Sequence, residues 1–173
     1  MTTFSNSDRL EIHELTARYA WSLDTGDVQT FVECFCRDGE LVWDVFETAG
    51  RWRAAAALRR FIEYFRQRPE SAGRQHHVTN LLVTPTASGA SARSYVAVAM
   101  RCANGPHALN VMGYYEDEIA RENGHWLFSR RYIRDWSGPV LAKFAGQDGV
   151  RSARPRPEAL AGLWATQEPG QGR

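Results

Sequence analysis

Four runs of apolar and β-branched residues follow one another in the second half of the sequence, at 76–84, 91–102, 108–119 and 126–136. Short segments rich in Gly, Pro and Asn separate them, as is typical of strands joined by tight connections. Because neighbouring strands twist relative to one another, runs this long predict a strongly curved sheet. The four runs therefore favour an antiparallel or mixed sheet over the parallel sheet of an α/β protein.

Helical patterns occupy the first part of the chain. Apolar residues recur there at helical spacing, and the expected helices span 8–23, 28–35 and 54–65. Ser7 is the expected N-cap of the first helix. The expected short strands between the second and third helices span 40–45 and 50–53. Three N-terminal helices followed by a strand meander predict an α+β domain whose helices close over the curved sheet and leave a cavity.

At 173 residues, the chain is long enough for one domain with a substantial core. From residue 146 the composition shifts toward Gly, Arg and Pro, so we expect a domain over 1–145 and a tail over 146–173. A short helix at 157–164 would present Leu163 and Trp164 from this tail. An apolar turn on a polar tail must dock somewhere, either over the pocket mouth or on another subunit.

The charge balance narrows the classes of partner. The 21 Lys and Arg residues against 20 Asp and Glu give a net charge of +1, so there is no long-range attraction to nucleic acid or to an anionic membrane. No segment approaches the ~18 apolar residues of a membrane span. The three cysteines are an odd number, and the N-terminus carries no signal-like pattern. We expect a soluble, cytoplasmic protein.

Neither a metal nor an organic cofactor is expected. His107, His125 and the His76-His77 pair do not have a metal-ligand spacing, and no Gly-rich phosphate loop is present. Lys143 is the only lysine and lies outside the expected core, so Schiff-base chemistry is not expected. Chemistry must then rest on acid–base side chains.

His76 and Asp24 are the principal candidates for catalysis. Strand alternation places His76 on one face with Val78, Asn80 and Leu82. Asp24 extends the apolar stripe of the first helix, where a carboxylate needs a partner. Taken singly, a strand histidine is more often structural, and Asp24 at a helix end can face solvent or bind a turn. Considered together, the two residues suggest a mechanism. A carboxylate bound to one ring nitrogen orients the imidazole, and the other ring nitrogen can then abstract or return a proton on the carbon next to a carbonyl.

Further candidates come from the same helix and from the last strand. Tyr19 is a second candidate for catalysis, since a phenol can polarise a substrate oxygen, although it also fits a core aromatic. Alternation places Arg130, Tyr132 and Arg134 on one face with Phe128, unless a bulge intervenes. Arg134 is the candidate for holding a substrate oxygen, against the ordinary expectation that an arginine lies on the surface. The expected substrate-binding residues are Trp21, Trp43, Phe61, Phe65, Asn80, Asn110, Met112, Tyr115, Phe128 and Tyr132.

Several segments together resemble the SnoaL-like domain of the NTF2-like superfamily. They are YAWSLDTGD at 19–27, the segment 35–39, QHHVTN at 75–80, GYYED at 113–117, GHW at 124–126 and RRY at 130–132. The resemblance covers roughly residues 7–135 and implies a cone-shaped NTF2-like fold. It extends to scytalone dehydratase, bile-acid 7-alpha dehydratase and hexachlorocyclohexane dehydrochlorinase, in which a helix-end Asp and a strand His act in proton abstraction and elimination.

Carried over by position, Asp24 and His76 match that pair, and the spacing of Tyr19 to Asp24 is similar to that of the bile-acid enzyme. The segment 132–134 resembles its Tyr-Val-Arg, which makes Arg134 a catalytic candidate after a shift of one residue. Two departures leave the reaction open. Val98 stands near the position of a pocket acid of the bile-acid enzyme. The second catalytic histidine of scytalone dehydratase has no clear match in this sequence.

The leading hypothesis is a cofactor-independent lyase or isomerase that dehydrates, isomerises or cyclises a hydrophobic small molecule by His–Asp acid–base catalysis. The alternative is a non-catalytic ligand-binding or dimerisation module, such as a small subunit of a ring-hydroxylating dioxygenase. An enclosed pocket joining His76 to Asp24 would favour the enzyme. A homo-oligomer is also expected, with His77, Arg93, Tyr95 and Arg131 on the outer face of the sheet.

Overall fold

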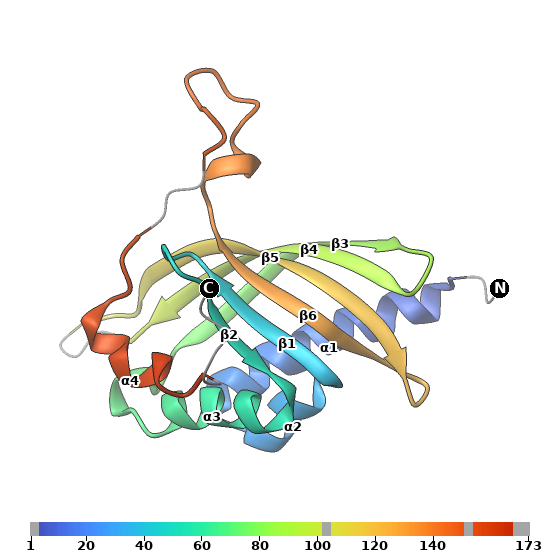
Figure 1. Cartoon of the computed structure of the whole chain (residues 1–173), viewed down its shortest axis with the longest axis horizontal. Coiled ribbons are helices and arrows are strands. Elements are labelled where there is room, and N and C mark those ends of the chain that lie inside the picture. The colour runs from blue at the N-terminus through green and yellow to red at the C-terminus, as the bar shows by residue number, and fades with distance from the viewer. Residues whose placement is uncertain (1–3, 102–104, 151–153, 168–173) are drawn as a thin grey trace.

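The computed structural model describes residues 4–101, 105–150 and 154–167. One face of a six-stranded, curved sheet is covered by the helices α1 (Asn6–Thr25), α2 (Val28–Glu33) and α3 (Ala54–Arg66) (Figure 1). The strands are β1 (Phe35–Asp44), β2 (Gly50–Arg53), β3 (Gln75–Pro85), β4 (Ala90–Met100), β5 (Ala108–Glu122) and β6 (His125–Asp135). The predicted α+β class, with three helices over a curved sheet, is confirmed.

The sheet has the order β2-β1-β6-β5-β4-β3. Strands β3 to β6 form the expected antiparallel meander, and β1 joins β6 in parallel, so the sheet is mixed. Strand β1 begins at Phe35, earlier than the predicted residue 40, because Phe35 pairs with Phe128 ahead of a register shift. Gly39 permits this pairing, since a Cβ there would lie 2.8 Å from the carbonyl oxygen of Phe128.

The start of α1 differs from the prediction. Ser5, rather than Ser7, is the N-cap: its hydroxyl accepts from the Asp8 N–H at 3.2 Å, and Asp8 accepts from the Ser5 N–H at 2.6 Å. The Asp8 carboxylate also accepts from Trp126 Nε1 at 2.9 Å and pairs with Arg121. The hydrogen bond from the Ser5 backbone, with those from Trp126 and the Ser5 hydroxyl, lowers the pKa of Asp8 to about 2. The ionised cap therefore ties the first turn of α1 to the end of the sheet.

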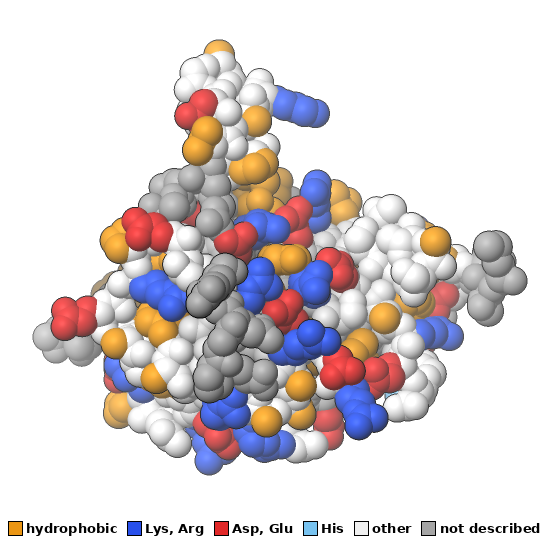
Figure 2. All heavy atoms as spheres, viewed as in Figure 1, with side chains coloured by type: hydrophobic (Ala, Val, Ile, Leu, Met, Phe, Trp, Pro, Cys, Tyr) orange, Lys and Arg blue, Asp and Glu red, His pale blue; other side chains and the backbone are white. Residues whose placement is uncertain are grey.

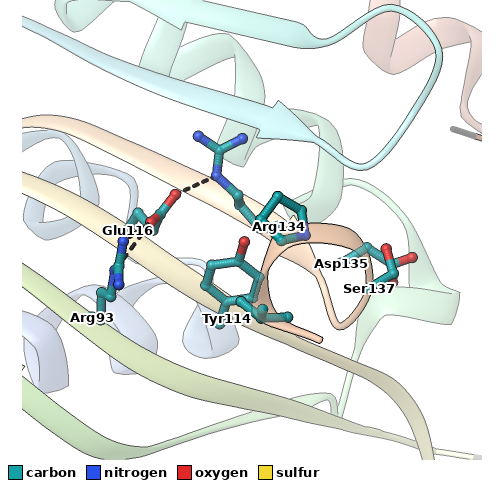
Figure 3. Close-up of a pocket in the computed structure, with 8 residues that line it drawn as sticks. Arg93, Tyr114, Glu116, Arg134, Asp135 and Ser137 are labelled. Atoms are coloured by element: carbon teal, nitrogen blue, oxygen red, sulfur yellow. Dashed lines mark hydrogen bonds and ion pairs between the residues drawn. The ribbon is translucent and has the colours of Figure 1, made fainter. Parts of the chain in front are cut away.

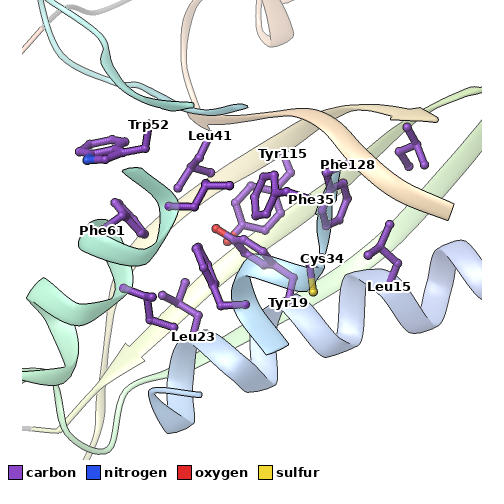
Figure 4. Close-up of a cluster of buried hydrophobic side chains, with 14 of the residues drawn as sticks. Leu15, Tyr19, Leu23, Cys34, Phe35, Leu41, Trp52, Phe61, Tyr115 and Phe128 are labelled. Atoms are coloured by element: carbon purple, nitrogen blue, oxygen red, sulfur yellow. The ribbon is translucent and has the colours of Figure 1, made fainter. Parts of the chain in front are cut away.

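Aromatic side chains fill the space between the helices and the sheet (Figure 4). Tyr19 of α1 lies at their centre, with ring centroids 5.2 Å from Phe31, 5.9 Å from Tyr115 and 5.9 Å from Phe128. The contacts of Tyr19 with Tyr115 and Phe128 are edge-to-face, and such packing adds to the stabilisation that burial alone provides. The interior of the cone is therefore occupied by side chains.

A bulge in the last hairpin reverses the predicted faces of β6. The register between β5 and β6 shifts between Glu118 and Ile119, so Phe128 and Arg131 point into the core while Arg130 points outward. The predictions that Arg131 lies on the outer face and that Arg130 shares a face with Phe128 are therefore wrong. A bulge adds one residue to one strand and turns every later side chain to the other face.

Arg131 is held inside the core by Asp117 of β5. The guanidinium donates from Nε and Nη2 to the two carboxylate oxygens at 2.8 and 2.7 Å, and both side chains are 0% exposed. Its carbon Cζ lies 3.9 to 4.3 Å from the ring centroids of Phe128, Tyr19 and Tyr115. Burial by itself would lower the pKa of Arg131, but the Asp117 carboxylate outweighs it and raises the pKa. The pair is an ionic centre enclosed by aromatic rings.

The C-terminal segment returns to the body beside α3 (Figure 1). A 3₁₀ turn, Glu158–Leu160, precedes the short helix α4 (Ala161–Trp164), and Leu163 is fully buried in the same core cluster. The Trp164 ring packs against Phe46 at 5.2 Å and Trp43 at 5.7 Å. Residues 138–150 instead project away from the body after the end of β6 (Figure 1).

Candidate active site

Asp24 and His76 meet where the last turn of α1 faces the start of β3. The Asp24 carboxylate contacts His76 through both oxygens: Oδ1 lies 2.5 Å from the ring nitrogen Nδ1, and Oδ2 accepts from the backbone N–H at 2.7 Å. The two side chains are only 16% and 11% exposed. A carboxylate at Nδ1 fixes the orientation of the ring and places the proton of the neutral imidazole on Nδ1. The lone pair is then on Nε2, to which no described residue is hydrogen-bonded.

Arg74 is the third charged residue of this site. Its Nη2 donates to the carbonyl oxygen of Leu23 at 2.9 Å, and its Cζ lies 4.5 Å from the ring centroid of Phe65. The Nε atom lies 3.9 Å from Asp24 Oδ1, too far for a hydrogen bond, and is buried without a partner among the described residues. Burial lowers the pKa of Arg74, and the charge of Asp24 opposes this effect. Sequence reasoning missed Arg74, although its place two residues before His76 was a usable signal.

The site opens into a groove of about 550 Å³ between α1 and β3. Residues 73–78 form one wall of the groove, and the other wall consists of Ala17, Ala20, Trp21, Asp24 and Thr25. Trp21, predicted to bind substrate, is 72% exposed and lies at this wall. The expected enclosed cavity is wrong: the groove is open to solvent, because the aromatic core fills the inside of the cone. Among the described residues, Asp24 and His76 therefore lack the enclosed pocket that was expected to favour an enzyme over a binding module.

A second bulge, in β3, changes the faces beyond His76. The pairing with β4 shifts between Thr79 and Leu82, and Asn80 has a positive φ of 54°. His76 and Val78 face the helices as predicted, but Leu82 is exposed and Leu81 packs on the core instead. Asn80 is exposed, so its predicted place on the face of His76 is also wrong.

Tyr19, predicted as catalytic, lies behind the dyad in the core. Its hydroxyl is fully buried and has no hydrogen-bond partner among the described residues. Burial raises the pKa of Tyr19 and that of the neighbouring Tyr115, so both phenols stay protonated. Figure 4 shows both hydroxyl groups directed toward the same part of the core.

Arg134 lies on the outer face of the sheet, so the predicted place in the pocket of His76 is wrong. Its Nε donates to Glu116 at 2.6 Å (Figure 3), and its Nη1 pairs with Asp44. Tyr132 lies on the same outer face, with the Arg134 Cζ 4.5 Å from its ring centroid. The bulge in β6 is the cause, because it turned the residues after Phe128 over. Arg134 also borders a separate outer pocket with Arg93 and Tyr114 (Figure 3).

The other predicted substrate-binding residues are dispersed. Trp43 and Phe65 belong to the aromatic cluster that α4 covers, while Phe61, Tyr115 and Phe128 are core residues. The remaining two, Asn110 and Met112, are exposed on β5. None of these seven side chains lines the groove. In the part of the chain that the structure describes, no group of three His, Cys, Asp or Glu side chains is arranged to hold a metal.

Comparison with known proteins identifies the family. A profile of the SnoaL-like domain matches residues 5–132. The chain therefore belongs to the SnoaL-like domain family, as its fold and the residues around Asp24 and His76 predicted. No protein with a curated description matches the chain.

Three solved structures illustrate the likeness. An NTF2-like protein with a cystatin-like fold from Novosphingobium aromaticivorans is 28% identical, with a TM-score of 0.69 over 82% of this chain and 90% of that one. A protein of unknown function from Mycobacterium tuberculosis is 24% identical, with a TM-score of 0.69 over 93% and 94%. A scytalone dehydratase-like protein from N. aromaticivorans is 22% identical, with a TM-score of 0.63 over 88% and 96%. At these identities the last two likenesses establish the NTF2-like fold and not a reaction.

Among the described helices, none is long and apolar enough to cross a membrane. Side chains of both charge signs are interspersed over the face seen in Figure 2. On the outer side of the sheet they form alternating pairs, such as Arg93 with Glu116 and Arg130 with Glu118. Among the described residues visible in Figure 2, no strongly basic stripe of the kind that binds nucleic acid is present.

Proposed function

We propose that the protein is a cofactor-independent lyase or isomerase that uses His76 as its proton-transfer group and Asp24 to orient it. One observation carries the proposal: Asp24 binds both Nδ1 and the backbone N–H of His76, which leaves Nε2 without a hydrogen-bond partner among the described residues, and His76 lines the groove. Such a pairing is the usual arrangement for a histidine that acts as a general base.

The proposed step begins with a substrate carbonyl compound in the groove. His76 Nε2 accepts a proton from the carbon next to the carbonyl, and the electron pair of the broken C–H bond moves into an enolate. The imidazolium, stabilised by the Asp24 carboxylate, then returns the proton. Return to another carbon is an isomerisation, and transfer to a departing hydroxyl group releases water. Attack of the enolate carbon on a second carbonyl group would be a cyclisation.

Exchange of α-protons with solvent tests this proposal without knowledge of the natural substrate. In D₂O, the wild type is expected to speed the loss of the α-proton NMR signals of a bicyclic ketone such as 2-tetralone. The variant His76→Asn is expected to lose about 10²- to 10⁴-fold of this acceleration. Circular dichroism establishes that the variant is folded. Equal exchange with the wild type and the variant would contradict the proposal and favour a ligand-binding module.

We also propose that the chain self-associates. Large apolar side chains are exposed on β3, β4 and β5 and on the projecting segment; they include Leu82, Tyr95, Leu109, Val111, Phe144 and Val150. Exposed apolar surface of this kind favours contact with another protein surface, and the balanced ion pairs on the sheet suit a second copy. Sedimentation velocity is expected to give a mass above the 19.6 kDa of one chain. A monomer at micromolar concentration would contradict this.

A further inference from the structure

We propose that Arg74 binds an anionic oxygen of the substrate, and that the substrates are planar cyclic carbonyl compounds whose enols ionise readily. The inference rests on the proposed function in one respect: it takes the groove beside Asp24 and His76 as the substrate site. Arg74 belongs to this groove, although no part of the acid–base argument requires it.

One nitrogen of the Arg74 guanidinium, Nε, is a buried donor without a hydrogen-bond partner among the described residues. The residue is 8% exposed, its Nη2 is bound to the Leu23 carbonyl oxygen, and Phe65 stacks on its guanidinium. Leaving a buried donor unsatisfied is costly, which makes such an atom a natural place for a ligand acceptor.

Asp24 does not fill this place. Its two oxygens bind His76, and Oδ1 lies 3.9 Å from Arg74 Nε, close enough for an ion pair but too far for a hydrogen bond. Its single negative charge balances Arg74 while the imidazole is neutral. Once His76 has accepted a proton, the three side chains together carry one positive charge. An enolate would restore neutrality, so the site is electrostatically matched to the deprotonated form of its substrate.

Two buried phenols add to this match. Burial raises the pKa of Tyr19 and of Tyr115, so both hydroxyl groups remain protonated and able to donate. The Tyr19 hydroxyl is a second buried polar group without a partner among the described residues. The Arg74 guanidinium and protonated phenols are groups that favour negative charge on a nearby oxygen.

The opposite wall of the groove indicates the shape of the ligand. Ala17 and Ala20 contribute little bulk, and the indole of Trp21 is 72% exposed beside them. An exposed indole at the edge of a groove offers a flat apolar surface on which a planar ring can stack. A planar ring that carries an acidic enol satisfies both this wall and Arg74.

Calorimetry with two matched coumarins tests the inference. 4-Hydroxycoumarin is a planar enol that is ionised at pH 7, and 4-methoxycoumarin is its neutral counterpart. The wild type is expected to bind the ionised compound at least about tenfold more tightly, as one charge-assisted hydrogen bond predicts. Arg74→Gln is expected to abolish this preference. Arg134→Gln, which removes a partly buried arginine on the outer face of the sheet, is expected to keep it.

Equal binding of the two coumarins by the wild type would overturn the inference, even if Arg74→Gln failed to fold. A preference that survives in folded Arg74→Gln would overturn it as well. The proposed function fails separately. If His76→Asn retains the preference for the enolate but the wild type shows no α-proton exchange, the oxyanion site stands and the acid–base proposal does not. If the wild type speeds α-proton exchange but shows no preference for the ionised coumarin, the acid–base proposal stands and the oxyanion site does not.

Discussion

Replacing Asp117 with asparagine is expected to lower the free energy of unfolding by about 3–5 kcal/mol, because it leaves the buried Arg131 guanidinium without its counter-charge. Both side chains are inaccessible to solvent, and the guanidinium already has one nitrogen, Nη1, without a partner among the described residues. Three aromatic rings surround the cation, but their attraction is too weak to replace an ionic bidentate partner. Urea denaturation followed by circular dichroism measures the change.

Glu118→Gln is the matched control for this substitution. Glu118 is the next residue on β5, on the opposite face, and its pair with Arg130 joins side chains that are 57% and 39% exposed. Exposed pairs of this kind contribute less than about 1 kcal/mol. If Asp117→Asn and Glu118→Gln had equally small effects, the description of Arg131 and Asp117 as an ionic centre of the core would be wrong.

Asp24→Asn is expected to reduce α-proton exchange by about 10²- to 10⁴-fold while the protein stays folded. The new amide can donate a hydrogen bond to Nδ1, which favours the ring form whose proton is on Nε2. With its proton on Nε2, the ring has no lone pair at the nitrogen that is proposed to act as the base. The amide also removes the negative charge that stabilises the imidazolium. Proton NMR in D₂O, with the same ketone that tests His76, gives the rate.

Asp27→Asn is the control for the loss of a carboxylate near the end of α1. Asp27 caps α2 by accepting from the Thr30 N–H at 3.1 Å, and it does not line the groove of His76. Asparagine is as good an N-cap as aspartate, so both stability and exchange should be close to those of the wild type. A similar loss of exchange in Asp24→Asn and Asp27→Asn would show that the carboxylate of Asp24 has no special role.

The sequence was sufficient to predict the contact between Asp24 and His76. Each residue lies on the predicted inward side of its own element, and the resemblance to the SnoaL-like domain placed the two elements against each other. The positions of the helices follow from local apolar spacing, which sequence patterns record well. The parallel pairing of β1 with β6 joins residues about ninety positions apart, for example Glu40 and Arg130, and has no local signal.

The bulges account for the largest errors. Because β6 contains one extra residue, Arg131 faces inward, whereas Arg134 was predicted to do so. The extra residue in β3 has the same effect: Leu81 faces inward in place of Leu82. A bulge depends on how two strands fit together and is therefore poorly recorded in either strand alone. Of these two bulges, the one in β3 has a local sequence signal: asparagine tolerates the positive φ that Asn80 adopts there.

The tautomer of His76 is the measurement that tests the central claim most directly, because it needs no substrate. The ¹⁵N chemical shifts of both ring nitrogens can be recorded in the wild type and assigned by their absence in His76→Asn. For the neutral ring we predict a proton on Nδ1, facing Asp24, and a lone pair on Nε2. A proton on Nε2 with the lone pair on Nδ1 would mean that Asp24 does not hold the imidazole as a base, and it would contradict the account.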